Sequence, residues 1–171
     1  MMKQFLSLFI FAVSLFAAPR AFAQDKSFSK SSFYGTMEIG AKSSNAKGAS
    51  YSSFDLLLCP SVSISSRWDI GMYIGARDLL DNKTDMVISR DGTIGYKVEY
   101  VRTDGAAGLQ QIFTVFSGPK KGRFETEAFL KVFHPKTRMA YIKTGVGYSA
   151  PYSGNKGFAY VSGGIGICLA N

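Results

Sequence analysis

After residue 23, the sequence has no apolar run long enough for a membrane-spanning helix, which needs about 20 predominantly apolar residues. It also lacks stretches with the apolar spacing of an amphipathic helix. Clusters of Lys and Arg are missing too, although the formal net charge is +8. Basic side chains scattered in this way argue against nucleic acid as a partner. These absences exclude a helical membrane protein and favour an all-β fold.

Histidine and cysteine are scarce. The single histidine, His134, precedes a proline and is predicted to lie in a turn, away from any partner for nucleophilic catalysis. The two cysteines, Cys59 and Cys168, fall on predicted strands that flank a third strand, roughly 9–10 Å apart, which is too far for a disulfide. We predict no catalytic residue, no cofactor, no metal ligand and therefore no enzyme.

One loop and one carboxylate pair are alternatives to that reading. The acidic loop side chains miss the spacing of a calcium-binding loop, so an exposed loop is the better interpretation of Asp78, Asp81, Asn82 and Asp85. Glu125 and Glu127 share a strand face, a pattern compatible with acid–base chemistry or a metal. Because lysines share that predicted space, an ion network explains the pair better.

The first 23 residues have the features of a secretory signal peptide. Lys3 supplies a positive start, residues 5–18 form an uncharged apolar run, and Ala21-Phe22-Ala23 matches a small-x-small cleavage site. We predict cleavage after Ala23, which leaves residues 24–171 as one β-barrel domain; a retained N-terminal anchor is the alternative. No cysteine follows the apolar run, so lipoprotein processing is not expected.

The rest of the chain alternates between apolar and polar residues with a period of two, which is typical of β-strands. Eight such runs lie between clusters of Gly, Ser, Asn and Asp, at residues 33–42, 51–64, 68–79, 93–102, 109–117, 123–133, 138–148 and 158–169. Their length suits tilted strands that cross a membrane, which need roughly 9–11 residues. Globular strands have about 5–6 residues.

The predicted connections alternate in length. Those after the first, third and seventh runs are long, at residues 43–50, 78–92 and 149–157, whereas residues 65–67 and 134–137 are short. Residues 103–108 and 118–122 are intermediate. Long loops after odd strands and short turns after even strands are the pattern of a barrel with both termini in the periplasm.

The charges sort onto one face of the strands. When the apolar face of each assigned strand points outward, the opposite faces place ten charges in the interior: Glu38, Asp55, Asp69, Arg77, Lys97, Glu99, Glu125, Glu127, Lys131 and Lys143. Eight strands enclose a space that side chains fill, where opposite charges offset each other's burial. The phase of the fifth run, 109–117, is not assigned because both faces are apolar. We predict an eight-stranded antiparallel up-and-down transmembrane β-barrel.

Aromatic residues mark the ends of these runs. Trp68, Phe33 and Tyr100 are predicted to form a girdle at one membrane interface, and Tyr148 and Phe54 lie toward the other. The alternative is that Phe and Tyr simply favour strands.

The last two runs, at residues 139–148 and 157–167, are punctuated by glycines. With the signal peptide and the strand rhythm, they resemble the small outer-membrane β-barrel family, meaning the OmpA/OmpX-like eight-stranded barrels and their porin-family relatives. The resemblance covers residues 32–169 and implies a Gram-negative cell outer membrane, outer-membrane lipid as surroundings, and extracellular or envelope partners at loops 43–50, 78–92 and 149–157. The chain departs from that family at its end, Cys168-Leu169-Ala170-Asn171, which lacks the terminal aromatic residue.

Two other functions remain open from the sequence. A soluble secreted or periplasmic β-barrel that binds a small apolar ligand would have the same alternation with its apolar faces inward. A small pore is a third reading, although eight strands leave little channel.

Overall fold

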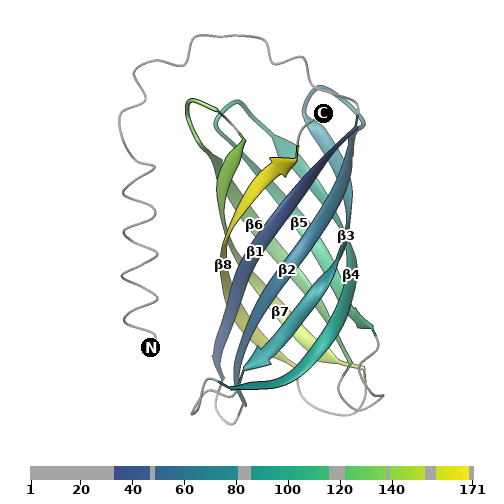
Figure 1. The fold of residues 1–171 in the computed structure, drawn as a ribbon, viewed down its shortest axis with the longest axis vertical. Coiled ribbons are helices and arrows are strands. Elements are labelled where there is room, and N and C mark those ends of the chain that lie inside the picture. Colours follow the sequence, from purple (N-terminus) through teal and green to yellow (C-terminus); the bar gives the residue numbers. More distant parts are fainter. Residues whose placement is uncertain are drawn as a thin grey trace.

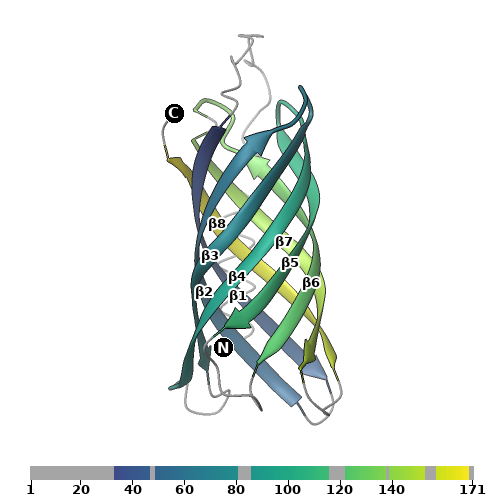
Figure 2. The same ribbon diagram turned by 90° about the vertical axis from the view of Figure 1, so that its right-hand side faces the viewer.

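The computed structural model describes residues 33–46, 49–80, 86–115, 122–137, 139–152 and 157–169. The predicted signal peptide, residues 1–23, lies outside these ranges, as do Asp81, Asn82 and Asp85 of the acidic loop. The described residues form an all-β fold whose eight antiparallel strands close into one barrel (Figures 1 and 2). The predicted number of strands and their closure are therefore confirmed.

The strands follow one another around the barrel in chain order. They are β1 (Phe33–Ala46), β2 (Ala49–Ser63), β3 (Trp68–Leu80), β4 (Val87–Val101), β5 (Gly105–Val115), β6 (Arg123–Phe133), β7 (Ala140–Pro151) and β8 (Phe158–Leu169). The first and last strands close the barrel, with Ile39 of β1 opposite Ile165 of β8. Closure gives every strand two neighbours, so the sheet keeps no free edge along its shared length.

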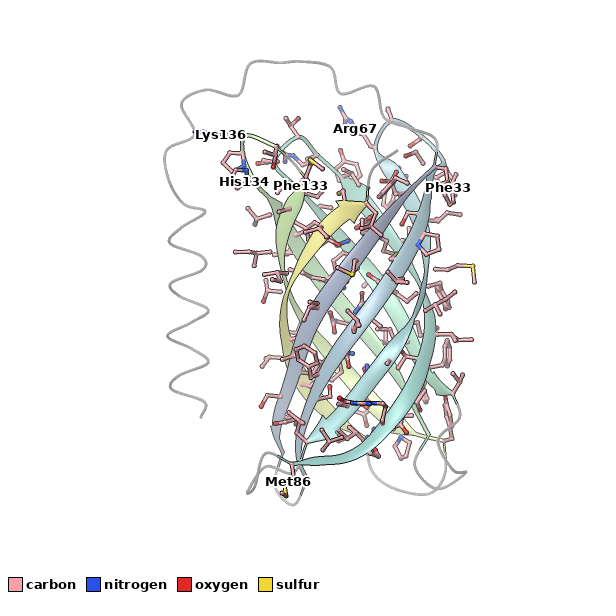
Figure 3. The ribbon with its side chains drawn as sticks, viewed as in Figure 1. Phe33, Arg67, Met86, Phe133, His134 and Lys136 are labelled. Carbon is pink, nitrogen blue, oxygen red and sulfur yellow. The ribbon has the colours of Figure 1, made fainter. Side chains whose placement is uncertain are left out.

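The two ends of the barrel carry different connections. At one end, which we call the turn end, lie Phe33, Arg67, His134 and Lys136, whereas Met86 lies at the opposite end, the loop end (Figure 3). Strand β8 (Phe158–Leu169) also ends at the turn end (Figure 1). This arrangement follows from an even number of strands that run up and down.

Three predicted loops are shorter than expected. Most of 78–92 is strand, because β3 continues to Leu80 and β4 already begins at Val87. Strands β1 and β2 likewise take up most of 43–50, and β7 continues to Pro151, which shortens 149–157. The prediction of a long loop 43–50 is therefore wrong. Ser, Asn and Asp favour turns individually, but pairing with a neighbouring strand holds them extended here.

Strand β5 is also displaced from its predicted position. It begins at Gly105 rather than residue 109, which reduces the preceding connection to a short turn. Its unassigned phase is settled by its neighbours, since Gln110 lies opposite both Lys97 of β4 and Glu127 of β6. Gln110 and Ile112 are buried inside, and Leu109 is exposed on the outside. Apolar alternation could not show this, because a buried isoleucine shares the inner face with polar side chains.

Candidate functional site: the ion-paired interior

All ten charged side chains that were predicted to face the interior are buried, none with more than 8% relative exposure. The structure adds Lys42 and Asp91, which are buried to the same degree. Lys42 is the last residue of a predicted strand and lies on its inward face, so the alternation itself would have found it. Asp91 fell in the predicted loop 78–92, and only its pairing opposite Arg77 places it on an inward face.

Ten of the twelve charges form two separate networks, and Asp91 and Glu127 belong to neither. The first, which we call the turn-side network, centres on Glu38 of β1. One Glu38 carboxylate oxygen lies 2.6 Å from Lys143 Nζ, and the other lies 3.0 Å from Lys131 Nζ. Tyr141 donates a hydrogen bond of 2.7 Å to the same carboxylate, and the Lys143 ammonium also donates to Gln110 at 2.6 Å. Several charged hydrogen bonds to one carboxylate offset much of the free-energy cost of burying its charge.

Glu99 extends the turn-side network toward the end of the barrel. Lys131 lies 3.0 Å from one Glu99 oxygen and therefore bridges Glu38 and Glu99. Lys97 donates to Glu99 at 2.5 Å, and the Tyr34 hydroxyl lies 2.7 Å from Asp69 and 3.2 Å from Glu99. Three lysines thus face three carboxylates, which leaves this network without net charge.

The second network, the loop-side network, has two cations and two carboxylates. Arg77 donates two hydrogen bonds to Asp55, of 2.7 and 2.9 Å, and its remaining nitrogen lies 2.8 Å from Glu125. Lys42 lies 3.0 Å from Asp55 and 2.5 Å from Glu125. Ser149 donates to Glu125 at 3.2 Å. Each carboxylate therefore contacts both cations, and the four charges cancel.

The residues best suited to catalysis or metal binding, the histidine and the two cysteines, lie outside the two networks. His134 sits in the turn between β6 and β7, where its ring contacts Thr137. Within the described ranges, no group of three or more His, Cys, Asp and Glu side chains is placed to hold a metal ion. Cys59 and Cys168 both lie opposite Thr36, one on each side of β1, and neither forms a disulfide. The predicted placement of the two cysteines on strands that flank a third strand is therefore confirmed.

The outer surface is the apolar one. Large apolar side chains are exposed around the whole barrel, including Leu56, Leu58, Ile70, Met72, Ile74, Ile94, Val98, Leu109, Leu130, Val132, Val146, Val161, Ile165 and Ile167. We call this surface the apolar belt. A contiguous apolar surface of this extent is unusual for a soluble monomer.

Polar and aromatic groups border the apolar belt. At the turn end, the rings of Trp68 and Tyr100 make an edge-to-face contact at 5.3 Å, and Arg67 donates to the Tyr100 hydroxyl. Toward the loop end, Asp78 and Arg90 form an exposed bidentate ion pair with distances of 2.7 and 3.0 Å. The prediction had no charge on the outward faces. It omitted this pair because both residues were assigned to the loop 78–92.

Among the described residues, no helix is long and apolar enough to span a membrane. A comparison with protein-family models found no match, and searches of the curated proteins and of the solved structures found none either.

Proposed function

We propose that this chain is a non-enzymatic outer-membrane β-barrel protein with a structural or surface-interaction role, exported through a cleaved signal peptide. The single observation that carries the proposal is the inverted polarity of the barrel. Its interior holds twelve buried charged side chains, and its exterior is covered by exposed Leu, Ile, Val and Met side chains. A soluble barrel with water outside and an apolar ligand inside would need polar side chains on its exterior and apolar side chains in its interior.

The free energy of hydration supports lipid as the surrounding medium. Burial of apolar area contributes about 25 cal/mol per Å², and the apolar belt gains this only when another apolar phase covers it. The backbone of a closed barrel satisfies its own hydrogen bonds, which is the requirement for a sheet in hydrocarbon. Strands of 11 to 15 residues exceed the roughly 9–11 residues needed to cross a bilayer.

The main alternative is a soluble barrel that binds a small apolar ligand. Such a protein needs an apolar interior. Two buried apolar clusters are present among the described residues and both are small: Leu57, Cys59, Tyr73 and Ile112, and Phe158 with Tyr160. A pore is disfavoured because the networks span the interior from wall to wall, with Lys143 of β7 reaching Glu38 of β1 and Gln110 of β5.

The surface-interaction role is assigned to the loop end. The strands leave residues 47–48, 81–86, 116–122 and 152–157 to connect them there. These segments and the strand ends beside them cover the loops that were predicted to contact extracellular or envelope partners. A barrel whose wall is held by lipid presents only its ends to such partners.

Fractionation tests the location directly. The protein is expected in the outer-membrane fraction, and its mobility on a gel should differ between unheated and boiled samples, because closed barrels resist the detergent until heated. Recovery from the soluble periplasmic fraction with no heat-dependent shift would refute the proposal.

A lysine scan of the outer face tests the apolar belt. Ile165 lies in the middle of β8, opposite Ile39 and Ile142, and is 59% exposed. Ile165→Lys should make insertion less favourable by about 2–4 kcal/mol if the site faces the midplane of a bilayer. Met86, 71% exposed beyond the strands at the loop end, supplies the matched control. Met86→Lys should insert normally, and equal behaviour of both variants would favour the soluble barrel.

A further inference from the structure

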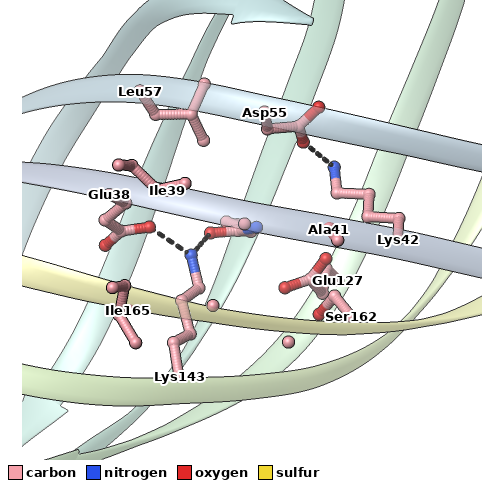
Figure 4. Close-up of a pocket in the computed structure, with 14 residues that line it drawn as sticks. Glu38, Ile39, Ala41, Lys42, Asp55, Leu57, Glu127, Lys143, Ser162 and Ile165 are labelled. Carbon is pink, nitrogen blue, oxygen red and sulfur yellow. Dashed lines mark hydrogen bonds and ion pairs between the residues drawn. The ribbon is translucent and has the colours of Figure 1, made fainter. Parts of the chain in front are cut away.

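A small cavity of about 30 Å³ lies between the two networks at the β1–β8 wall, where outward Ile39 and Ile165 also line it. Figure 4 shows Lys143 directed to Glu38 on one side of it and Lys42 directed to Asp55 on the other, with Glu127 between them. The cavity exists because β1 and β8 place glycines opposite each other there, Gly40 and Gly164, and neither fills the interior.

Glu127 lies between the two networks and differs from Glu38, Glu99, Asp55 and Glu125, which all form ion pairs. It is 1% exposed, yet no Lys, Arg or His among the described residues lies within 4.0 Å of its carboxylate. Its Oε2 atom has no hydrogen-bond partner, and neither does the hydroxyl of Ser162, which lines the same cavity. A buried carboxylate is costly, at several kcal/mol for an isolated charge, and an oxygen without a donor leaves that cost partly uncompensated.

The neighbouring cations do not pair with Glu127, because both are already engaged. Lys42 lies 2.5 Å from Glu125 and 3.0 Å from Asp55. Lys143 donates to Glu38 and Gln110, each at 2.6 Å. Since both networks are neutral without Glu127, its charge has no direct counterion in the interior.

The cavity lining selects the kind of ligand. An anion is disfavoured because the lining holds three carboxylates and two ammonium groups. A metal cation is disfavoured because no group of three or more His, Cys, Asp and Glu side chains among the described residues is placed to hold one. The ligand must therefore be neutral, must donate a hydrogen bond to Glu127, and must fit 30 Å³. A water molecule needs about 10–15 Å³ of such space and two to four polar partners.

We propose that this cavity is an internal hydration site, in which water donates hydrogen bonds to Glu127 and Ser162 and links them to both ion networks. Glu127 and Ser162 are close enough to share one ligand. A Cβ added at Gly145, on β7 between their strands, would lie 2.6 Å from Glu127 Oε1 and 2.8 Å from Ser162 Oγ. Bridging water then supplies donors to Glu127 in addition to the neighbouring Tyr160 hydroxyl.

Nuclear Overhauser effects between water and carbon-bound protons test this site in the full chain, folded in detergent micelles. The Hα protons of Gly40 and Gly164 should show cross-peaks to the water signal, because they line the cavity and do not exchange with solvent. Absence of these cross-peaks in the unmodified protein would overturn the proposal.

Two variants identify the origin of the signal. An added Cβ at Gly40 has the Gly163 carbonyl oxygen at 3.5 Å as its nearest neighbour, so Gly40→Ala fits the fold and should displace water, with loss of the Gly164 cross-peak. Persistence of that cross-peak would contradict the assignment. Gly35→Ala is the matched control, since its added Cβ meets only Leu169, at 3.8 Å, and should leave the cross-peaks unchanged.

Exchange of the Ser162 hydroxyl with water is the competing source of the signal. Ser162→Ala removes that hydroxyl but leaves Glu127 as a hydrogen-bond acceptor, so the cross-peaks at Gly40 and Gly164 should persist. Their loss in this variant would show that the hydroxyl, and not bound water, produced them.

Discussion

Two arginines of β3 and β4 make nearly the same ion pair in opposite environments. Arg77 binds Asp55 through two hydrogen bonds of 2.7 and 2.9 Å, and Arg90 binds Asp78 through two of 2.7 and 3.0 Å. The arginine side chain is 1% exposed in the first pair and 72% exposed in the second. The bidentate geometry is therefore matched, whereas Arg77 is buried and also contacts Glu125, so the two sites compare an arginine of the interior network with one on the surface.

Arg77→Met should be strongly destabilising. It removes one cation of the loop-side network, which leaves Lys42 as the counterion of both Asp55 and Glu125. Removal of one partner from a buried ion pair costs about 3–5 kcal/mol, because an uncompensated charge stays behind. Arg90→Met should cause no measurable change, since water solvates Asp78 when its partner is lost.

Equilibrium unfolding in urea measures both variants. The chain has a single tryptophan, Trp68, which lies on the outer surface at the turn end, so its fluorescence reports removal of the barrel from lipid or detergent. Equal losses of stability in the two variants would refute the reasoning. So would an Arg77→Met protein as stable as the original.

A second substitution tests whether charge balance causes the loss. Glu125→Gln added to Arg77→Met leaves one cation, Lys42, and one carboxylate, Asp55, in the loop-side network. The double variant should recover part of the stability that Arg77→Met loses. A further loss equal to that of Glu125→Gln alone would show that the two residues are not coupled.

The two glutamates of β6 should respond differently to neutralisation. Glu125→Gln weakens charged hydrogen bonds from Lys42 and Arg77, each worth about 1.5–3 kcal/mol. Glu127→Gln breaks no ion pair, so it should lower the free energy of unfolding by less in the same urea titration. The reverse order of the two losses would contradict the structure. The thiols provide a separate check, because Cys168 is partly exposed and Cys59 is buried. A thiol-alkylating reagent should modify Cys168 first in the folded protein, and faster labelling of Cys59 would show that the two have been placed wrongly.

The sequence alone determined the strand count and the inward set of charges, because a strand alternates its side chains strictly between two faces. Ten charges on six of the strands could be sorted without knowing which strand lies beside which. The same alternation would also have placed Lys42 on the inward face. Alternation also placed Trp68 and Tyr100 at one end of the barrel, where the structure brings their rings into contact.

Only the tertiary structure decided where the strands end and which charges meet. Val87 to Asp91 read as loop in the sequence, since Ser, Arg and Asp have no strand preference of their own. Pairing with β3 makes these residues strand, and this places Asp91 inside and Arg90 outside. The phase of β5 depended in the same way on the register of β4 and β6.

The division of the interior into two neutral networks was beyond the sequence as well. Glu125 and Glu127 share a strand face and are indistinguishable by alternation, yet one contacts two cations and the other contacts none within ion-pair distance. Contacts across a barrel depend on the stagger between strands far apart in the chain, such as β1 against β7. The local sequence does not determine that stagger, because the stagger arises only when the sheet closes.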